Sequence, residues 1–305
     1  MSPLKKILLT IALTAMWSPS YLFIKLAIED FQPLTVAASR VTLGGLILFV
    51  IMTLRGNRLP KDLWFWIHST MMAIFASVIP FTLFCLAEQS IESALAAIIN
   101  GGAPMFTALL AHATIPSDRM NTQKALGISL STIGLLFLFA PNIMGGLSGT
   151  TFGMLAAIGG TISYGISHVY AKKYIMGQAH FVAPTAQLIS SAVILLPLMF
   201  LVDQPYNMST PSLTSILGIA GLTCFGTVLA LSIYYNLIEH CGATAVSMVA
   251  CFFPVGGMLL GFIFLNEQMP PQNLAAAAVI LLGMMLVNGL IKLRVVEKEK
   301  MELQD

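Results

Sequence analysis

The chain has little charge. Only 9% of its 305 residues are charged, whereas 57% are apolar and the mean hydropathy is +0.87. In a typical soluble globular domain, about a quarter of the residues are charged. The composition therefore excludes a soluble globule and predicts a protein embedded in a lipid bilayer.

Several motifs are also missing. The sequence has no GxxxxGK(S/T) loop, so ATP hydrolysis is not expected. Its four cysteines lie in or beside apolar stretches without CxxC spacing, which predicts packing residues and neither a disulfide framework nor a metal site. Histidines and carboxylates occur singly, without the clustering that an integral-membrane enzyme needs. We expect no catalysis, no cofactor, no metal and no nucleic-acid partner.

The uncharged stretches are long enough to cross a membrane. A hydrocarbon core about 30 Å thick requires about 20 apolar residues in an α-helix. We predict an all-α integral membrane protein with ten transmembrane helices, short loops and no soluble domain. The predicted spans are residues 6–27, 33–54, 64–87, 93–115, 122–140, 151–173, 182–202, 213–237, 243–265 and 272–292.

Positive charge is distributed unevenly between the predicted loops. If the N-terminus is cytoplasmic, thirteen of the fifteen Lys and Arg residues fall in cytoplasmic segments. The opposite loops contain Glu29, Asp30, Glu92 and Asp203 and carry no Lys or Arg. The positive-inside rule therefore predicts that both termini are cytoplasmic.

The two halves of the chain resemble one another. A shift of 147 residues places Tyr164 on Trp17, and a shift of 150 places Pro254 on Pro104. Each half divides into five predicted spans, and an odd number of spans inverts the second copy in the bilayer. Two inverted five-helix repeats are typical of secondary transporters. The predicted domains are residues 1–145 and 146–305.

Prolines interrupt the predicted helices. Pro19 lies inside the first span, Pro104 inside the fourth and Pro254 inside the ninth. Asn100 precedes the second of these breaks, and Phe252 precedes the third. Breaks at matching positions of two repeats are the best sequence indication of a binding site, and a purely structural scaffold has no need of them.

Aromatic side chains recur at repeat-related positions within the spans. Such rings line a central cavity and hold an aromatic or cationic solute, or they pack between helices or form an interfacial belt. Trp17 and Tyr164 lie in mid-span, which argues against a belt and favours a cavity. The aromatic residues predicted to line it are Trp17, Tyr21, Phe84, Tyr164, Tyr234 and Phe252.

An arginine lies inside the second predicted span. Arg40 recognises a carboxylate or stabilises one transport state, or it extends to the membrane surface aided by Glu29 or Asp30. The shift of 147 places Gln187 at the equivalent position of the second half, so this position is polar in both halves but charged only in the first. We predict that Arg40, Gln187 and Asn100 contact the solute.

Two titratable residues are candidates for coupling transport to an ion. His168 lies one turn after Tyr164 on the same helix face, where it takes part in proton coupling, substrate binding or a hydrogen bond between helices. Glu88 ends the third span and is either a coupling carboxylate or a solvated charge. Lys25 is predicted to cap the last turn of its own helix.

A pair of glycines has the spacing of a helix-packing motif. Gly257 and Gly261 form a GxxxG in the ninth predicted span. This motif permits close helix approach inside one bundle or between two protomers. A homodimer and a monomer therefore both stay open.

The residues match a known family. The segments WSPSYLFIK from Trp17 to Lys25, PLTVAASR ending at Arg40, the stretch around Pro104 and LNEQMPPQNLAAAAVILLGMMLVN after Pro254 resemble the paired EamA domains of the drug/metabolite transporter superfamily. The resemblance covers nearly the whole chain. It implies ten helices in two inverted halves around a cavity, in the inner membrane of a bacterium, and in many relatives the export of amino acids or other small metabolites.

The sequence departs from the family pattern at two points. Glu267 after the ninth span matches the family, but its counterpart in the first half is Ser117, followed by Asp118. Pro19 stands close to where relatives carry a small residue, so the geometry of the first helix is expected to differ.

These observations predict a secondary transporter that works by alternating access. Because the predicted cavity contains little fixed charge, its substrate is expected to be a neutral or zwitterionic metabolite such as an amino acid, moved outward. The alternative is a carrier of choline-like quaternary ammonium ions or other drug-like cations, because aromatic rings bind such groups.

Overall fold

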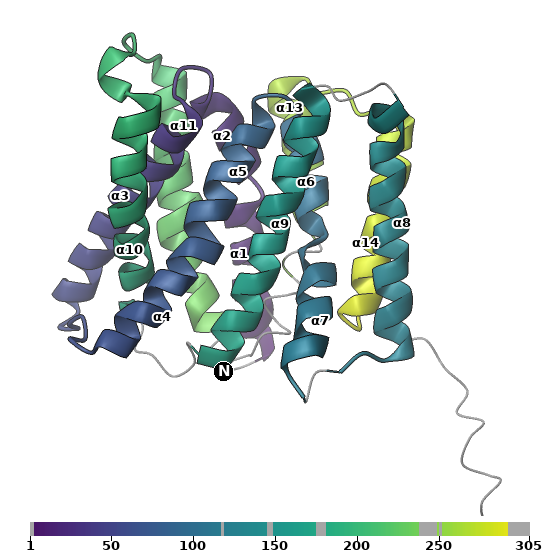
Figure 1. Cartoon of the computed structure of the whole chain (residues 1–305), viewed down its shortest axis with the longest axis horizontal. Helices are drawn as coiled ribbons and strands as arrows, with labels where there is room; N and C mark the ends of the chain where they lie inside the picture. The colour runs from purple at the N-terminus through teal and green to yellow at the C-terminus, as the bar shows by residue number, and fades with distance from the viewer. Residues whose placement is uncertain are drawn as a thin grey trace, which may run out of the picture.

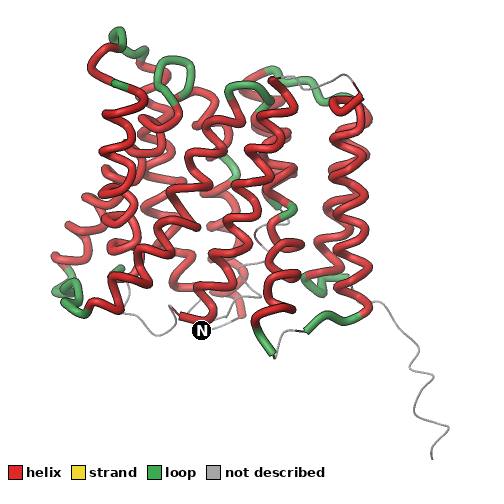
Figure 2. Tube along the Cα trace, viewed as in Figure 1, coloured by secondary structure: helices red, strands yellow, loops and turns green. Residues whose placement is uncertain are grey.

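The molecule is a bundle of helices. The computed structural model describes residues 3–116, 119–144, 149–174, 181–237, 249 and 252–291. Within these residues every regular element is helical, and Figure 2 shows loops only at the ends of helices and at breaks within them. The helices stand side by side and run between two ends of the molecule (Figure 1). We call these the upper and lower ends, as drawn in Figure 1, with the N-terminus at the lower end.

The first half of the chain forms helical elements at the centre and at both edges of the bundle (Figure 1). They are α1 (Pro3–Trp17), α2 (Ser20–Ala27), α3 (Pro33–Leu54), α4 (Leu63–Ala73), the π-helical segment η1 (Ile74–Val78), α5 (Ile79–Glu88), α6 (Ser93–Gly101), α7 (Ala103–Thr114) and α8 (Thr122–Met144).

The second half of the chain supplies the remaining helical elements. It contains α9 (Gly149–Tyr174), α10 (Val182–Leu198), the π-helical η2 (Met199–Asp203), the short 3-10 helix η3 (Pro205–Asn207), α11 (Leu213–Thr223), the π-helical η4 (Cys224–Leu229), α13 (Phe253–Leu265) and α14 (Pro271–Val287). The helix that contains α11 and η4 continues to Leu237.

Length and composition make many of these helices suitable for crossing a membrane. Seven helical stretches of the described chain qualify, two shorter apolar helices (α13 and α14) lie near the C-terminus, and α9 has 26 residues. The seven stretches are Leu8–Ala27, Pro33–Leu54, Leu63–Glu88, Ser93–Thr114, Thr122–Ala140, Val182–Asp203 and Leu213–Leu237.

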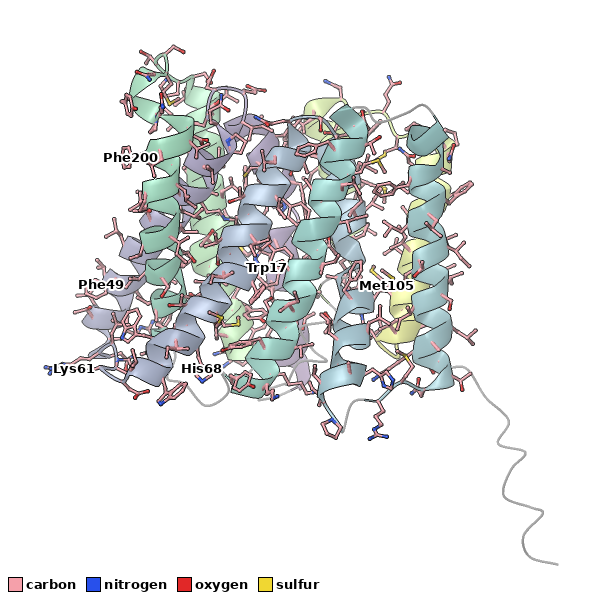
Figure 3. The ribbon with its side chains drawn as sticks, in the orientation of Figure 1. Trp17, Phe49, Lys61, His68, Met105 and Phe200 are labelled. Carbon is pink, nitrogen blue, oxygen red and sulfur yellow. The ribbon has the colours of Figure 1, made fainter. Side chains whose placement is uncertain are left out.

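Large apolar side chains cover the outside of the bundle. Phe49 and Phe200 lie at its left edge in Figure 3, and each exposes more than two fifths of its surface. Leu46 and Ile263 are even more exposed. An apolar coat of this kind is stable in lipid and not in water, so the exposed surface agrees with the membrane class predicted from composition.

Prolines mark the places where helices stop and restart. Pro19 lies between α1 and α2, and Pro104 lies in the first turn of α7, directly after the end of α6. Pro254 lies in the first turn of α13, and the residues just before Phe252 are outside the described part. Proline has no N–H to donate and fixes φ, so it begins a helix readily and interrupts one already formed.

The broken helices of the two halves cross closely. A Cβ added to Gly101 at the end of α6 would lie 2.6 Å from Cγ of Pro254, and one added to Gly257 would overlap Cβ of Ala97. Only glycine permits this approach. Gly257 of the GxxxG motif therefore faces α6 of its own chain, so that face is not free to join two protomers.

At the upper end, two carboxylates each accept hydrogen bonds from the N-terminus of a helix. Asp30 accepts a hydrogen bond from the N–H of Ser212 before α11 (2.8 Å), and Asp203 accepts from the N–H (2.6 Å) and hydroxyl (2.9 Å) of Thr35 in α3. The bonds from Ser212 hold the pKa of Asp30 below its ordinary value. Each carboxylate lies in one half of the chain and binds the start of a helix in the other, where the helix dipole favours negative charge.

Candidate functional site

A cavity lies at the centre of the bundle, near the middle of its height, where Figure 3 shows Trp17. Its volume is about 90 Å³, enough for several water molecules or part of a small solute. Both halves of the chain contribute to its wall. The lining residues are Trp17, Ser20, Tyr21, Ile24, Arg40, Ala76, Phe81, Phe84, Asn100, Ala103, Tyr164, His168, Gly226, Leu231 and Phe253.

Arg40 provides a buried positive charge at this wall. Its side chain is 5% exposed. Nε donates to the Thr227 hydroxyl at 2.8 Å, Nη2 donates to the carbonyl of Gly226 at 3.0 Å, and the guanidinium carbon lies 3.7 Å from the centre of the Phe81 ring. These partners are all neutral. Among the described residues no carboxylate pairs with this arginine, so its charge is left without a counter-ion.

The snorkelling interpretation of Arg40 is wrong. Asp30, one of the two acids expected to help it, instead binds Ser212. The guanidinium points inward because η4 offers acceptors there. In a π-helical segment the hydroxyl of Thr227 reaches back five residues to the carbonyl of Leu222 (2.9 Å), and its oxygen is left to accept from Arg40.

The repeat-related glutamine takes part in a matching contact. Gln187 in α10 donates from Nε2 to the hydroxyl of Ser77 in η1 at 2.8 Å. A shift of 150 carries η1 onto η4 and Ser77 onto Thr227, just as a shift of 147 carries Arg40 onto Gln187. The second helix of each half therefore binds the π-helical segment of the other half, and only one of the two contacts carries charge.

Tyr21 and Asn100 join the two broken helices of the first half. The amide nitrogen of Asn100 donates to the hydroxyl of Tyr21, and both side chains are more than nine-tenths buried. The Oδ1 oxygen of Asn100 has no hydrogen-bond partner, and neither has the hydroxyl of Ser20 on the cavity wall. Buried polar atoms are normally hydrogen-bonded, so these two atoms are available to a bound solute.

Aromatic rings form the side of the cavity facing α9. Phe84 stacks against Tyr164 with ring centres 6.0 Å apart, and Tyr164 stacks on His168 at 6.4 Å. Tyr21 meets Phe84 edge to face at 5.8 Å. His168 also lies 3.4 Å from the hydroxyl of Thr107 in α7, so it makes the contact between helices that was one of its predicted roles.

Three residues predicted to contact the solute lie elsewhere. Gln187 is 2% exposed, and its side-chain amide is already hydrogen-bonded to Ser77 and to the hydroxyl of Tyr235 (2.7 Å). Tyr234 packs behind Trp17, with ring centres 5.5 Å apart. Phe252 is half exposed, and its neighbour Phe253 lines the cavity instead.

Other lining residues were not predicted. Phe81, Ser20 and Gly226 have residue types that are ordinary in a membrane helix, so their type alone did not mark them as lining residues. Phe81 lies one helical turn before Phe84. The spacing of three residues was a usable signal for a shared helix face.

Glu88 and Lys25 meet at the upper side of the site. Glu88 is completely buried, one turn beyond Phe84, and neither of its carboxyl oxygens has a hydrogen-bond partner. Lys25 donates to the carbonyls of Glu88 (2.7 Å) and Ile91 (3.0 Å). Two predictions are therefore corrected: Lys25 caps the end of α5 and not of its own helix, and Glu88 is not a solvated charge.

Comparison with known proteins agrees with this architecture. A family model described as the EamA-like transporter family matches residues 4–140 and 151–289. A solved structure described only as "Crystal structure of protein" superposes with a TM-score of 0.69 at 16% identity, covering 95% of this chain and 99% of that one. This structure shares the fold.

Sequence relatives are named as transporters. The "Uncharacterized inner membrane transporter YedA" of Escherichia coli (strain K12) is 25% identical over 277 residues, covering 90% of this chain and 88% of the relative. The "Probable amino-acid metabolite efflux pump" of Salmonella typhimurium is 24% identical over 290 residues, covering 90% and 92%. With a family model that matches both halves, the chain belongs to the EamA-like transporter family.

Proposed function

We propose that the protein is a secondary transporter in which two inverted five-helix halves, residues 1–145 and 146–305, alternate around the central cavity. The matched contacts of Arg40 with η4 and of Gln187 with η1 support this arrangement, because an inverted pair of halves exchanges equivalent contacts across its pseudo-two-fold axis. In this proposal ten spans cross the membrane and both termini are cytoplasmic.

The substrate is a small solute that carries a carboxylate, most simply a zwitterionic amino acid. The observation that supports this choice is the buried charge of Arg40, which has only neutral partners. A carboxylate from the solute would supply the missing counter-charge, and a charge-assisted bond to guanidinium is among the stronger hydrogen bonds in proteins. The unpartnered Oδ1 of Asn100 is then an acceptor for the solute's ammonium group.

The apolar part of the solute has a place as well. Trp17, Phe84 and Tyr164 offer ring surfaces on the same cavity, and burial of an apolar side chain against them adds affinity. We infer export as the direction, in line with the name of the probable amino-acid metabolite efflux pump of Salmonella typhimurium. The bacterial inner membrane is the corresponding location, as in the name of the relative YedA.

A carrier of quaternary ammonium ions is the second candidate. The stacked rings of Phe84 and Tyr164 favour it, because aromatic faces attract cations. The charge of Arg40 on the same wall opposes it, since two like charges in a buried site repel strongly. A zwitterion suits both the aromatic rings and the charge of Arg40, whereas a cation without a carboxylate suits only the rings.

Exchange in proteoliposomes tests the proposal. We expect the wild-type protein to exchange external radiolabelled L-phenylalanine for internal L-phenylalanine, and Arg40→Gln to lower the apparent affinity about tenfold or more, the effect of losing one charge-assisted hydrogen bond. Arg55→Gln is the matched control, because Arg55 is exposed and lies away from the cavity. Equal affinity in all three proteins would reject Arg40 as the carboxylate site.

A further inference from the structure

Two buried carboxylates lie near one another at the upper side of the site, in very different surroundings. Glu267 is 9% exposed and accepts three hydrogen bonds from the start of α6: Ser93 N (2.8 Å), Ser93 hydroxyl (3.0 Å) and Ala94 N (3.0 Å). Glu88 is fully buried and accepts none. Glu267 is thus stabilised as an anion by a helix N-terminus, and Glu88 has no such support.

The two charged side chains that act on Glu88, Lys25 and Glu267, are opposite in sign. Lys25 from α2 is bound to carbonyls at the end of α5, and Glu267 is bound to N–H groups at the start of α6. These are the charged groups that act on Glu88, and the titratable side chains of Tyr21 and Cys85 also lie within its electrostatic reach. A second anion here would be an unpaired charge at a fully buried position, which is strongly unfavourable.

Lys25 does not neutralise Glu88 directly. Its ammonium donates to two backbone carbonyls, and among the described residues it forms no ion pair with a carboxylate. An ionised Glu88 so close would compete for this ammonium. Because neither oxygen of Glu88 has a hydrogen-bond partner, burial penalises an ionised carboxylate here more than a neutral carboxyl group.

The position of Glu88 also suits a group that couples proton movement to transport. Phe84, one turn earlier on α5, lines the cavity, and Tyr21 of the same cavity packs edge to face against Phe84. Beyond Glu88 the loop between α5 and α6 is held by Lys25 and Glu267 at the upper end (Figure 1). The residue therefore lies between the cavity and the upper end of the molecule.

We propose that Glu88 is a proton-binding site, and that its proton is the ion exchanged for substrate. The inference rests on the proposed transport function. When the upper end is open, the Glu88 carboxylate takes a proton from the water there, which makes it neutral and allows the loop to close. When the cavity opens to the lower end, the proton passes to water on that side, so one proton crosses per cycle and the carboxylate is regenerated.

Infrared spectroscopy of the reconstituted protein tests the proton site without any substrate. We expect a protonated-carboxyl band at neutral pH in the wild type, its loss in Glu88→Gln, and its persistence in Glu267→Gln, whose parent carboxylate is already hydrogen-bonded. A wild-type spectrum without this band, or a band that survives Glu88→Gln, would overturn the proposal.

Flux measurements test the coupling. Proteoliposomes containing the wild type should accumulate L-phenylalanine when a pH gradient is imposed, whereas Glu88→Gln should exchange L-phenylalanine for itself without responding to the gradient, and Glu88→Asp should recover the response. A gradient response that persists in Glu88→Gln contradicts coupling through this residue. If wild-type protein does not move L-phenylalanine, the proposed function fails, and the infrared result still decides whether Glu88 holds the proton.

Discussion

Arg40 and Asn100 show how single residues define the chemistry of the cavity. A buried arginine without an anionic partner destabilises a protein unless hydrogen bonds or a ligand satisfy its charge. Thr227, Gly226 and the Phe81 ring satisfy part of this requirement. In our proposal, a carboxylate of the solute satisfies the remaining part.

Asn100 allows a structural bond to be separated from a binding role. Both Tyr21→Phe and Asn100→Ala remove the Tyr21–Asn100 hydrogen bond, and each should lower stability by about 1 kcal/mol. Only Asn100→Ala also removes the unpartnered Oδ1. We therefore expect L-phenylalanine affinity to fall in Asn100→Ala and to stay near the wild-type value in Tyr21→Phe, measured as ligand-dependent thermal stabilisation. Equal loss in both variants would mean that Oδ1 contributes nothing to binding.

Seven of the fifteen residues that line the cavity were predicted from the sequence, because aromatic and polar side chains are noticeable within membrane helices. Arg40, Tyr21 and Asn100 all belong to this group, and their role in binding stays a prediction. Phe252 was predicted in place of Phe253 because the helix start after the break could not be fixed to the residue. An error of one position turns a side chain by about 100° around a helix axis.

At the scale of helices, the breaks and π-helical segments position the site. The gap between α1 and α2 brings Ser20 and Tyr21 to the cavity, and the end of α6 brings Asn100. The π-helical segments were not predictable, because no residue type specifies them. They became visible as equivalent features only once the structure placed η1 and η4 150 residues apart.

Glu267 links two helices of different halves, which gives a prediction at this scale. Glu267→Ala removes three hydrogen bonds from the start of α6 and should lower the free energy of unfolding by about 2 kcal/mol or more. Glu92→Ala is the matched control, because Glu92 precedes the same helix and its side chain forms no capping bond. Thermal denaturation in detergent compares the two. A melting temperature lowered equally by both changes would show that the cap is not the cause.

At the scale of the whole molecule, composition was sufficient to predict the helical membrane class, since lipid excludes most other backbone arrangements. The number of spans is harder to derive from sequence, because helix breaks such as those at Pro19 and Pro104 make it difficult to locate where one span ends and the next begins. The part of the predicted span 243–265 that precedes Phe252 lies largely outside the described residues.

The proposed topology predicts which surfaces face the outside of the cell. Lys61 at the lower end is exposed, and Tyr206 in η3 is 69% exposed (Figure 3 labels Lys61). In a cysteine-free background, a membrane-impermeant maleimide should label Tyr206→Cys in intact cells and label Lys61→Cys only after lysis. The reverse pattern would contradict cytoplasmic termini.

The central claim is that this transporter recognises a carboxylate through Arg40. The most direct measurement is the thermal stabilisation of the purified wild-type protein by L-phenylalanine, phenethylamine and choline at equal concentrations, because a ligand that binds the folded state raises its melting temperature. We expect L-phenylalanine to stabilise the protein and the two cations, which lack a carboxylate, to have little effect. Stabilisation by phenethylamine or choline that equals or exceeds that by L-phenylalanine would contradict the claim and favour the cation carrier.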